Sequence, residues 1–187
     1  MKPEDFIHNA EMQTPIVYVQ YKGIFDMQDL YEAIADFLRQ KKFKFYEKQN
    51  RLRRPSAFGA ELAHNFEARR KVEDYYEFVV NINIETFDFK DVEVVLKDGT
   101  KKKMIKGRIW VQLYGTVVMD YEKIWEKGAF LAYLKSFYNK YIVKKKIEGV
   151  WWDELQYKIV LRLHALIKER LKMASEGSEF KHMAGVH

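Results

Sequence analysis

Cysteine is absent from the chain, and proline and glycine are scarce, with 3 and 9 residues among 187. The absence of cysteine excludes disulfides and thiolate metal sites, so nothing argues for an oxidising compartment. No segment approaches the roughly 20 consecutive apolar residues that a transmembrane helix needs. The N-terminal stretch 1–12 contains acids and no apolar run of signal-peptide length. We therefore expect a cytoplasmic protein without membrane insertion.

Aromatic residues are plentiful, at 16% of the chain, within a hydrophobic content of 48% and a charged content of 32%. This balance is ordinary for a soluble globular protein and too apolar for a disordered one. A chain of this length buries roughly 70% of its unfolded surface. We expect one domain over residues 1–173 and a disordered tail over 174–187, where apolar periodicity is lost.

An amphipathic helix is predicted directly after the first strand. The strand candidate covers residues 14–25, and the helix follows over 26–42. Asp26 stands where its carboxylate can accept the free N–H groups of the first turn, and Phe25 and Leu30 occupy the two positions of a hydrophobic staple.

The stretch 75–100 alternates like a strand, but its apolar phase changes. Apolar residues hold the even positions first, and then Phe87 and Phe89 hold odd ones. Since side chains alternate with a period of two, a phase change requires an extra residue or a sharp bend. We expect a bulge near Glu85 and Thr86. A break between two separate strands is the alternative.

The remaining elements follow from the same patterns. Alternation predicts further strands, and two apolar stripes at helical spacing predict helices near the C-terminus. The first stripe consists of Phe130, Leu131, Leu134, Phe137, Tyr138, Tyr141 and Ile142. The expected ranges are strands at 42–48, 62–72, 91–97 and 107–121, a basic, mobile loop at 49–61, and helices at 130–142 and 152–173, separated by a break at Glu148 and Gly149.

The order of elements defines an α+β domain. It is a coiled antiparallel sheet of about six strands, with one helix after the first strand and two C-terminal helices packed on one face. By element order only, it resembles the helix-grip arrangement of START-like lipid-binding domains, in which such a sheet grips a long C-terminal helix. The single helix after the first strand and the two terminal helices depart from that arrangement. One function that this architecture allows is carriage of an apolar ligand between the sheet and the last helix.

Positive charge is concentrated in two segments, 39–54 and 97–108, within a net charge of +6. Such clusters supply phosphate contacts for RNA or DNA, although charge runs at turns and edge strands commonly serve solubility. The candidate contacts are Lys41, Lys42, Lys44, Arg51, Arg53, Arg54, Lys101, Lys102, Lys103 and Arg108.

A second group of candidates is polar and aromatic. If their strands pair in register, Asn81, Asn83, Trp110, Gln112 and Tyr114 share one side of the sheet, either lining a pocket or forming its wet side. The candidate anchors for a protein partner are Trp151, Trp110 and Tyr114. Trp151 belongs to an unusual Trp–Trp dipeptide.

No catalytic, dinucleotide-binding, phosphate-binding or metal-ligand motif is present in the sequence. We therefore expect no cofactor and no metal. The leading hypothesis is a non-enzymatic interaction or self-assembly module, because aromatic residues are in excess and a long meander must have edges. The alternatives are nucleic-acid binding through the two basic segments and carriage of an apolar ligand.

Overall fold

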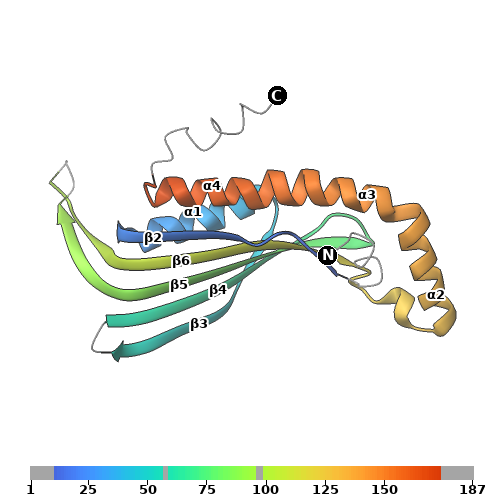
Figure 1. The fold of residues 1–187 in the computed structure, drawn as a ribbon, viewed down its shortest axis with the longest axis horizontal. Coiled ribbons are helices and arrows are strands. Elements are labelled where there is room, and N and C mark those ends of the chain that lie inside the picture. Colours follow the sequence, from blue (N-terminus) through green and yellow to red (C-terminus); the bar gives the residue numbers. More distant parts are fainter. Residues whose placement is uncertain (1–10, 57–58, 96–98, 174–187) are drawn as a thin grey trace, which may run out of the picture.

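The computed structural model describes residues 11–56, 59–95 and 99–173. Six strands form one open, antiparallel sheet, and two C-terminal helices follow it (Figure 1). This architecture confirms the α+β class that the sequence predicts. The expected tail at 174–187 lies outside the described residues.

One strand, β6, has partners along both of its edges. The sheet order is β1-β6-β5-β4-β3, and β2 pairs with β6 beside β1, so β1 and β2 lie end to end along one edge. The strands are β1 (Glu11–Gln13), β2 (Val17–Phe25), β3 (Lys44–Ser56), β4 (Gly59–Lys71), β5 (Tyr76–Val95) and β6 (Lys101–Met119). The helical segments are α1 (Met27–Gln40), η2 (Ile124–Glu126), α2 (Ala129–Tyr138), η3 (Asn139–Val143), α3 (Lys144–Gly149), η4 (Val150–Val160) and α4 (Leu161–Arg170).

The start of α1 matches the sequence prediction. The Asp26 carboxylate accepts hydrogen bonds of 3.1 Å from the backbone N–H groups of Gln28 and Asp29. Phe25 and Leu30, at the two staple positions, are both buried. The cap and the staple together fix where the chain leaves β2 and enters α1.

The phase change in β5 is a bulge within one strand of 20 residues. Phe87 pairs with Arg108 and Lys90 pairs with Lys106, so β5 holds one residue more than β6 between these pairs. The bulge therefore lies after Phe87, slightly later than predicted. Asp88 has a φ of 52°, a left-handed conformation that aspartate tolerates better than bulkier residues.

The loop predicted at 49–61 is wrong, because β3 continues to Ser56 and β4 begins at Gly59. Pro55 is compatible with a strand here because β3 is the edge of the sheet, where a missing N–H leaves no interior partner unsatisfied. The β3–β4 register also shifts between Arg53 and Ser56. Proline, bulges and basic residues are devices that protect an edge strand from pairing with another chain.

The break predicted at Glu148 and Gly149 is also wrong. Residues 129–170 are helical throughout, and Gly149 has helical φ and ψ values of −65° and −47°. Glycine inside a helix costs only about 1 kcal/mol, which packing readily offsets. The first C-terminal helix is α2, and the second runs from α3 through η4 to α4. The two meet at a bend between α2 and α3, and the second, which we call the long helix, crosses the sheet (Figure 1).

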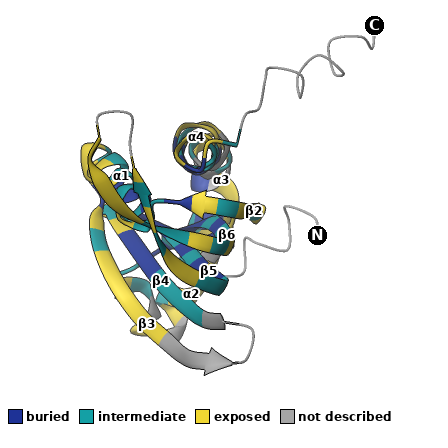
Figure 2. Cartoon of the chain, turned by 90° about the vertical axis from the view of Figure 1, so that its left-hand side faces the viewer, coloured by how far each residue is buried: buried dark blue, intermediate teal, exposed yellow. Residues whose placement is uncertain are grey.

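The core lies between the sheet and the helices α1, η4 and α4. Apolar residues of β5 and β6 face the same side because they pair in register, as Ile82 does with Leu113. Their buried partners on the long helix are spaced to form one face: Leu155, Ile159, Leu163 and Ile167. Figure 2 shows the buried stretches of the central strands beneath the helices and the more exposed β3 edge.

Two contacts at Gly115 bring distant parts of the chain against β6. Thr14, between β1 and β2, donates its N–H to the Gly115 carbonyl and accepts the Gly115 N–H on its Oγ1, both at 2.8 Å. On the core side, a Cβ added at Gly115 would lie 2.7 Å from the Leu155 Cγ. The helix therefore rests directly on the sheet at this point.

We predict that Gly115→Ala lowers the free energy of unfolding by about 1–3 kcal/mol, because Leu155 must move to accommodate the added methyl group. Gly149→Ala is the matched control, since nothing lies within 4 Å of its added Cβ. Replacing glycine within a helix should raise stability by about 0.5–1 kcal/mol. Chemical denaturation measures both. Unchanged stability of Gly115→Ala would contradict the close contact.

Candidate functional site

The face of the sheet that points away from α1 and α4 brings the predicted polar and aromatic residues together. In the β5–β6 register, Asn83 lies opposite Gln112 and Asn81 lies opposite Tyr114. The Asn83 Nδ2 donates a 3.3 Å hydrogen bond to the Gln112 Oε1. Trp110, on the same side of β6, is 41% exposed. These five side chains form an open surface, which we call the outer sheet face.

An aromatic pair stands out on the outer sheet face. Tyr18 of β2 and Trp110 of β6 have ring centroids 6.0 Å apart, and the Tyr18 side chain is 50% exposed. A groove of about 320 Å³ lies beside this pair. Its lining residues are Gln20, Tyr21, Lys22, Phe87, Arg108, Ile109 and Trp110. The side chains of Tyr21 and Ile109 pack against the core, so two aromatic rings, two cations and an amide remain for the outer side.

The groove was only partly predictable. Trp110 and Arg108 are among the sequence candidates, but Tyr18, Lys22 and Phe87 are not. The missing signal is the register, in which Tyr18 pairs with Gln112 and Lys22 pairs with Arg108 across the β2–β6 boundary. Alternation shows which residues of one strand share a face, but it does not show which strand lies alongside.

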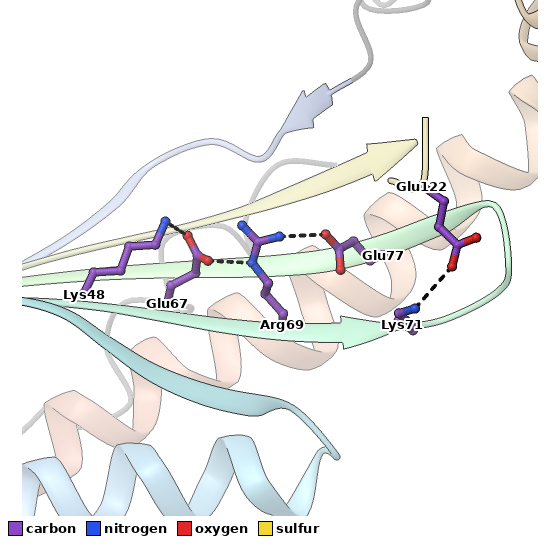
Figure 3. A network of polar contacts seen from close by, with 6 residues as sticks. All are labelled: Lys48, Glu67, Arg69, Lys71, Glu77 and Glu122. Atoms are coloured by element: carbon purple, nitrogen blue, oxygen red, sulfur yellow. Dashed lines mark hydrogen bonds and ion pairs between the residues drawn. The ribbon is translucent and has the colours of Figure 1, made fainter. Parts of the chain in front are cut away.

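A network of charges borders the outer sheet face, because Glu67 lies opposite Asn81 in the β4–β5 register. Figure 3 shows this network. Glu67 of β4 is ion-paired with Lys48, its carboxylate accepts a 2.6 Å hydrogen bond from Arg69 Nε, and Arg69 Nη1 reaches Glu77 of β5 at 3.0 Å. Glu67 and Glu77 are buried by these partners. A second pair, Lys71 with Glu122 at 3.5 Å, joins β4 to the turn after β6.

The network lowers the pKa of Glu67. Burial alone raises the pKa of this carboxyl, but the hydrogen bonds and positive charges of Lys48 and Arg69 act in the opposite direction and outweigh burial. The anionic form is therefore the stable one in the folded protein. Glu67 ties the edge strand β3, which carries Lys48, to the interior strand β4.

The predicted nucleic-acid contacts fall in two places that do not converge. Lys41, Lys42, Lys44 and Arg51 lie at the end of α1 and on β3, whereas Lys101, Lys102, Lys103 and Arg108 lie on β6. The strands β4 and β5 separate β3 from β6. The side chains of Arg53 and Arg54 lie outside the described part of the structure.

Two of the cations on β6 already have acidic partners. Arg108 holds Asp88 of the β5 bulge, with its Nε at 3.1 Å from Oδ2. Lys102 pairs with Asp26, the residue that caps α1, and this pairing helps to lower the pKa of Asp26 against the opposing effect of burial. Positive charge at these two positions serves local structure.

The third predicted anchor, Trp151, lies in η4, and its side chain is outside the described residues. Of the apolar stripe predicted over 130–142, some residues pack against the rest of the protein and others are exposed. Tyr138 packs inward, but Phe130, Phe137, Tyr141 and Ile142 are exposed. The sequence reveals that these residues are apolar without revealing that they remain uncovered.

The described residues 11–56, 59–95 and 99–173 contain neither a metal-binding cluster of acidic and histidine side chains nor a membrane-spanning helix. Within these ranges, no group of three or more histidine, aspartate or glutamate side chains could hold a metal ion. No helix there is long and apolar enough to cross a membrane.

No known protein family matches the chain, and no curated protein is detectably similar to it.

We predict that Glu67→Gln lowers the free energy of unfolding at pH 7 by about 1–2 kcal/mol, because charge-assisted hydrogen bonds are lost. The pKa of Glu67 is depressed in the folded protein, so its contribution is present above the unfolded pKa and disappears as the pH falls through the folded one. The difference in unfolding free energy between wild type and variant should therefore begin to shrink as the pH falls below about 4.3, the usual pKa of glutamate, and close once the pH lies below the folded pKa.

Urea denaturation of both proteins from pH 7 to pH 3 measures this gap. Glu93→Gln is the control, because Glu93 is an exposed carboxylate on β5 outside the network. A gap that stays constant across the acid range would contradict the role assigned to the ionised Glu67.

Proposed function

We propose that the protein is a non-enzymatic self-assembly module, in which two copies associate through their outer sheet faces. The observation that carries this proposal is the juxtaposition of the half-exposed Tyr18–Trp110 pair with an open groove on the same face. A two-fold interface brings the same patch of each copy together, so a protruding ring of one copy meets the groove of the other.

The composition of the patch suits a protein contact. Tryptophan, tyrosine and arginine dominate the binding energy of protein interfaces, and Trp110, Tyr18 and Arg108 lie together here. The face also lacks a covering helix among the described elements, and two sheets pack face to face at about 10 Å. A second sheet would therefore bury the aromatic pair without rearranging the fold.

Charge on the outer sheet face favours a second copy as the occupant. Besides the Arg108–Asp88 pair, the exposed Lys22 borders the groove, and the exposed Glu85 lies on the neighbouring strand β5. Since both signs occur side by side, a two-fold rotation can place acids of one copy opposite bases of the other.

The two alternative functions have less geometric support. The strands β4 and β5 separate the two basic strands, β3 and β6, and Arg108 and Lys102 are paired with acids. A carrier would need space between the sheet and the long helix, but Leu155 closes directly on Gly115. Nucleic-acid binding and ligand carriage remain untested predictions.

We predict a dimer whose dissociation constant rises at least about 30-fold in the double variant Tyr18→Ala, Trp110→Ala, as expected for interface hot spots. Sedimentation velocity over a wide concentration range measures it. Tyr133→Ala is the control, because Tyr133 is a more exposed aromatic residue on α2, away from the outer sheet face. A wild type that stays monomeric, or a double variant that dimerises normally, would reject the proposal.

A further inference from the structure

The outward side of the helical segment 129–143 carries a row of exposed aromatic rings. Phe130, Tyr133, Phe137 and Tyr141 follow one another at spacings of three and four residues, so they share one side of the helix. Three of them are at least 65% exposed, and Phe137 is 47% exposed. The rings of Phe137 and Tyr141 are 4.9 Å apart. We call this row the α2 aromatic face.

The other side of the same segment is already packed against the end of the sheet. Tyr138 stacks with Trp125 at 5.6 Å, and Tyr75 donates its hydroxyl to the Asn139 carbonyl Oδ1 at 2.5 Å. Burial raises the pKa of Tyr75 to about 12, so this hydroxyl stays protonated as the donor.

A buried ion pair gives the segment a second attachment. Lys135 Nζ lies 3.0 Å from the Asp120 Oδ2, and both side chains are largely shielded from water. The Asp120 carboxylate also accepts the backbone N–H groups of Ile124 and Trp125. Because these contacts fix the inward side, the α2 aromatic face cannot turn inward. A helix that is apolar on both sides requires a second apolar surface.

Lysine is the only charged residue type close to this face in the sequence. Residues 127–147 contain six lysines and no aspartate or glutamate. Lys127, Lys140 and Lys145 are exposed, and Lys140 Nζ lies 5.3 Å from the ring centre of Tyr141. Lys146 is paired with Glu73. The surface that covers the α2 aromatic face must therefore accept aromatic rings and be negatively charged.

A second copy does not fit this requirement, because a two-fold contact through the α2 aromatic face would bring two sets of lysines together. A bilayer with anionic lipids fits it. Aromatic rings favour the headgroup region, and lysines beside them bind the negative surface.

We propose that the α2 aromatic face docks the protein on the surface of an anionic lipid bilayer. The segment lies at the end of the molecule opposite the end of β5 and the start of β6, and it projects beyond the sheet (Figure 1). It rests on the membrane in the interfacial plane, with the rings among the headgroups. The outer sheet face, on a different part of the molecule, takes no part in this contact.

Flotation with vesicles tests this inference, using one set of pure phosphatidylcholine and one with about a third phosphatidylserine. We expect the full chain to float with the anionic vesicles, and binding to weaken as salt rises. The variant Phe130→Ser, Phe137→Ser should bind at least about tenfold more weakly. The variant Lys127→Gln, Lys140→Gln, Lys145→Gln should lose about 100-fold, at roughly fivefold for each lysine.

Matched controls separate this inference from self-assembly. Tyr46→Ser removes an exposed aromatic ring from β3 and should bind vesicles like the wild type. The double variant Tyr18→Ala, Trp110→Ala should also bind them while it fails to dimerise. Retained dimerisation of the Phe130→Ser, Phe137→Ser protein would show that it is folded.

Two results would overturn the inference. The first is an absence of flotation at low salt. The second is unchanged vesicle binding in both α2 variants. A protein that is retained on RNA or DNA but does not float with the vesicles would likewise overturn the inference.

Discussion

The pairing of β5 with β6 is the interaction on which the other elements depend. These two strands are the longest of the sheet, and their register places Ile82 beside Leu113 and Ile84 beside Val111 on one side. That apolar side supports the long helix and α1, while β4 and β2 attach to the outer edges of the pair. If one of the two strands slipped by one residue, its apolar row would turn away from the helices while that of its partner stayed in place, so the core itself selects the register.

Local patterns predicted the elements that short-range physics determines. The capped start of α1 depends on Asp26 and its near neighbours, so it was correct from sequence. The bulge in β5 was expected for the right reason, although the extra residue lies after Phe87. The continuation of β3 through Pro55 could not be predicted, because proline is tolerated there only at the edge of a sheet, and strand order is a property of the whole fold.

The candidate surfaces were harder to predict for a related reason. Hydrophobic periodicity groups residues on one side of an element, but it cannot show whether another element covers that side. Phe137 and Tyr138 are adjacent in the sequence and equally aromatic, yet Tyr138 packs on Tyr75 and Phe137 is exposed. Likewise Trp110 was a candidate from its type and from the side of the strand that alternation gives it, but only the β2–β6 pairing shows that Tyr18 lies beside it.

The hydrogen bonds between Thr14 and Gly115 join residues that are 101 positions apart in the chain. During synthesis, β2 leaves the ribosome before β6, which is its only strand partner in the described structure and follows after four other described elements. Loop-closure entropy must be overcome before such a distant pairing contributes any stability. The strand β2 is therefore made well before its partner, and until the two pair, the edge of β6 that β2 covers is open.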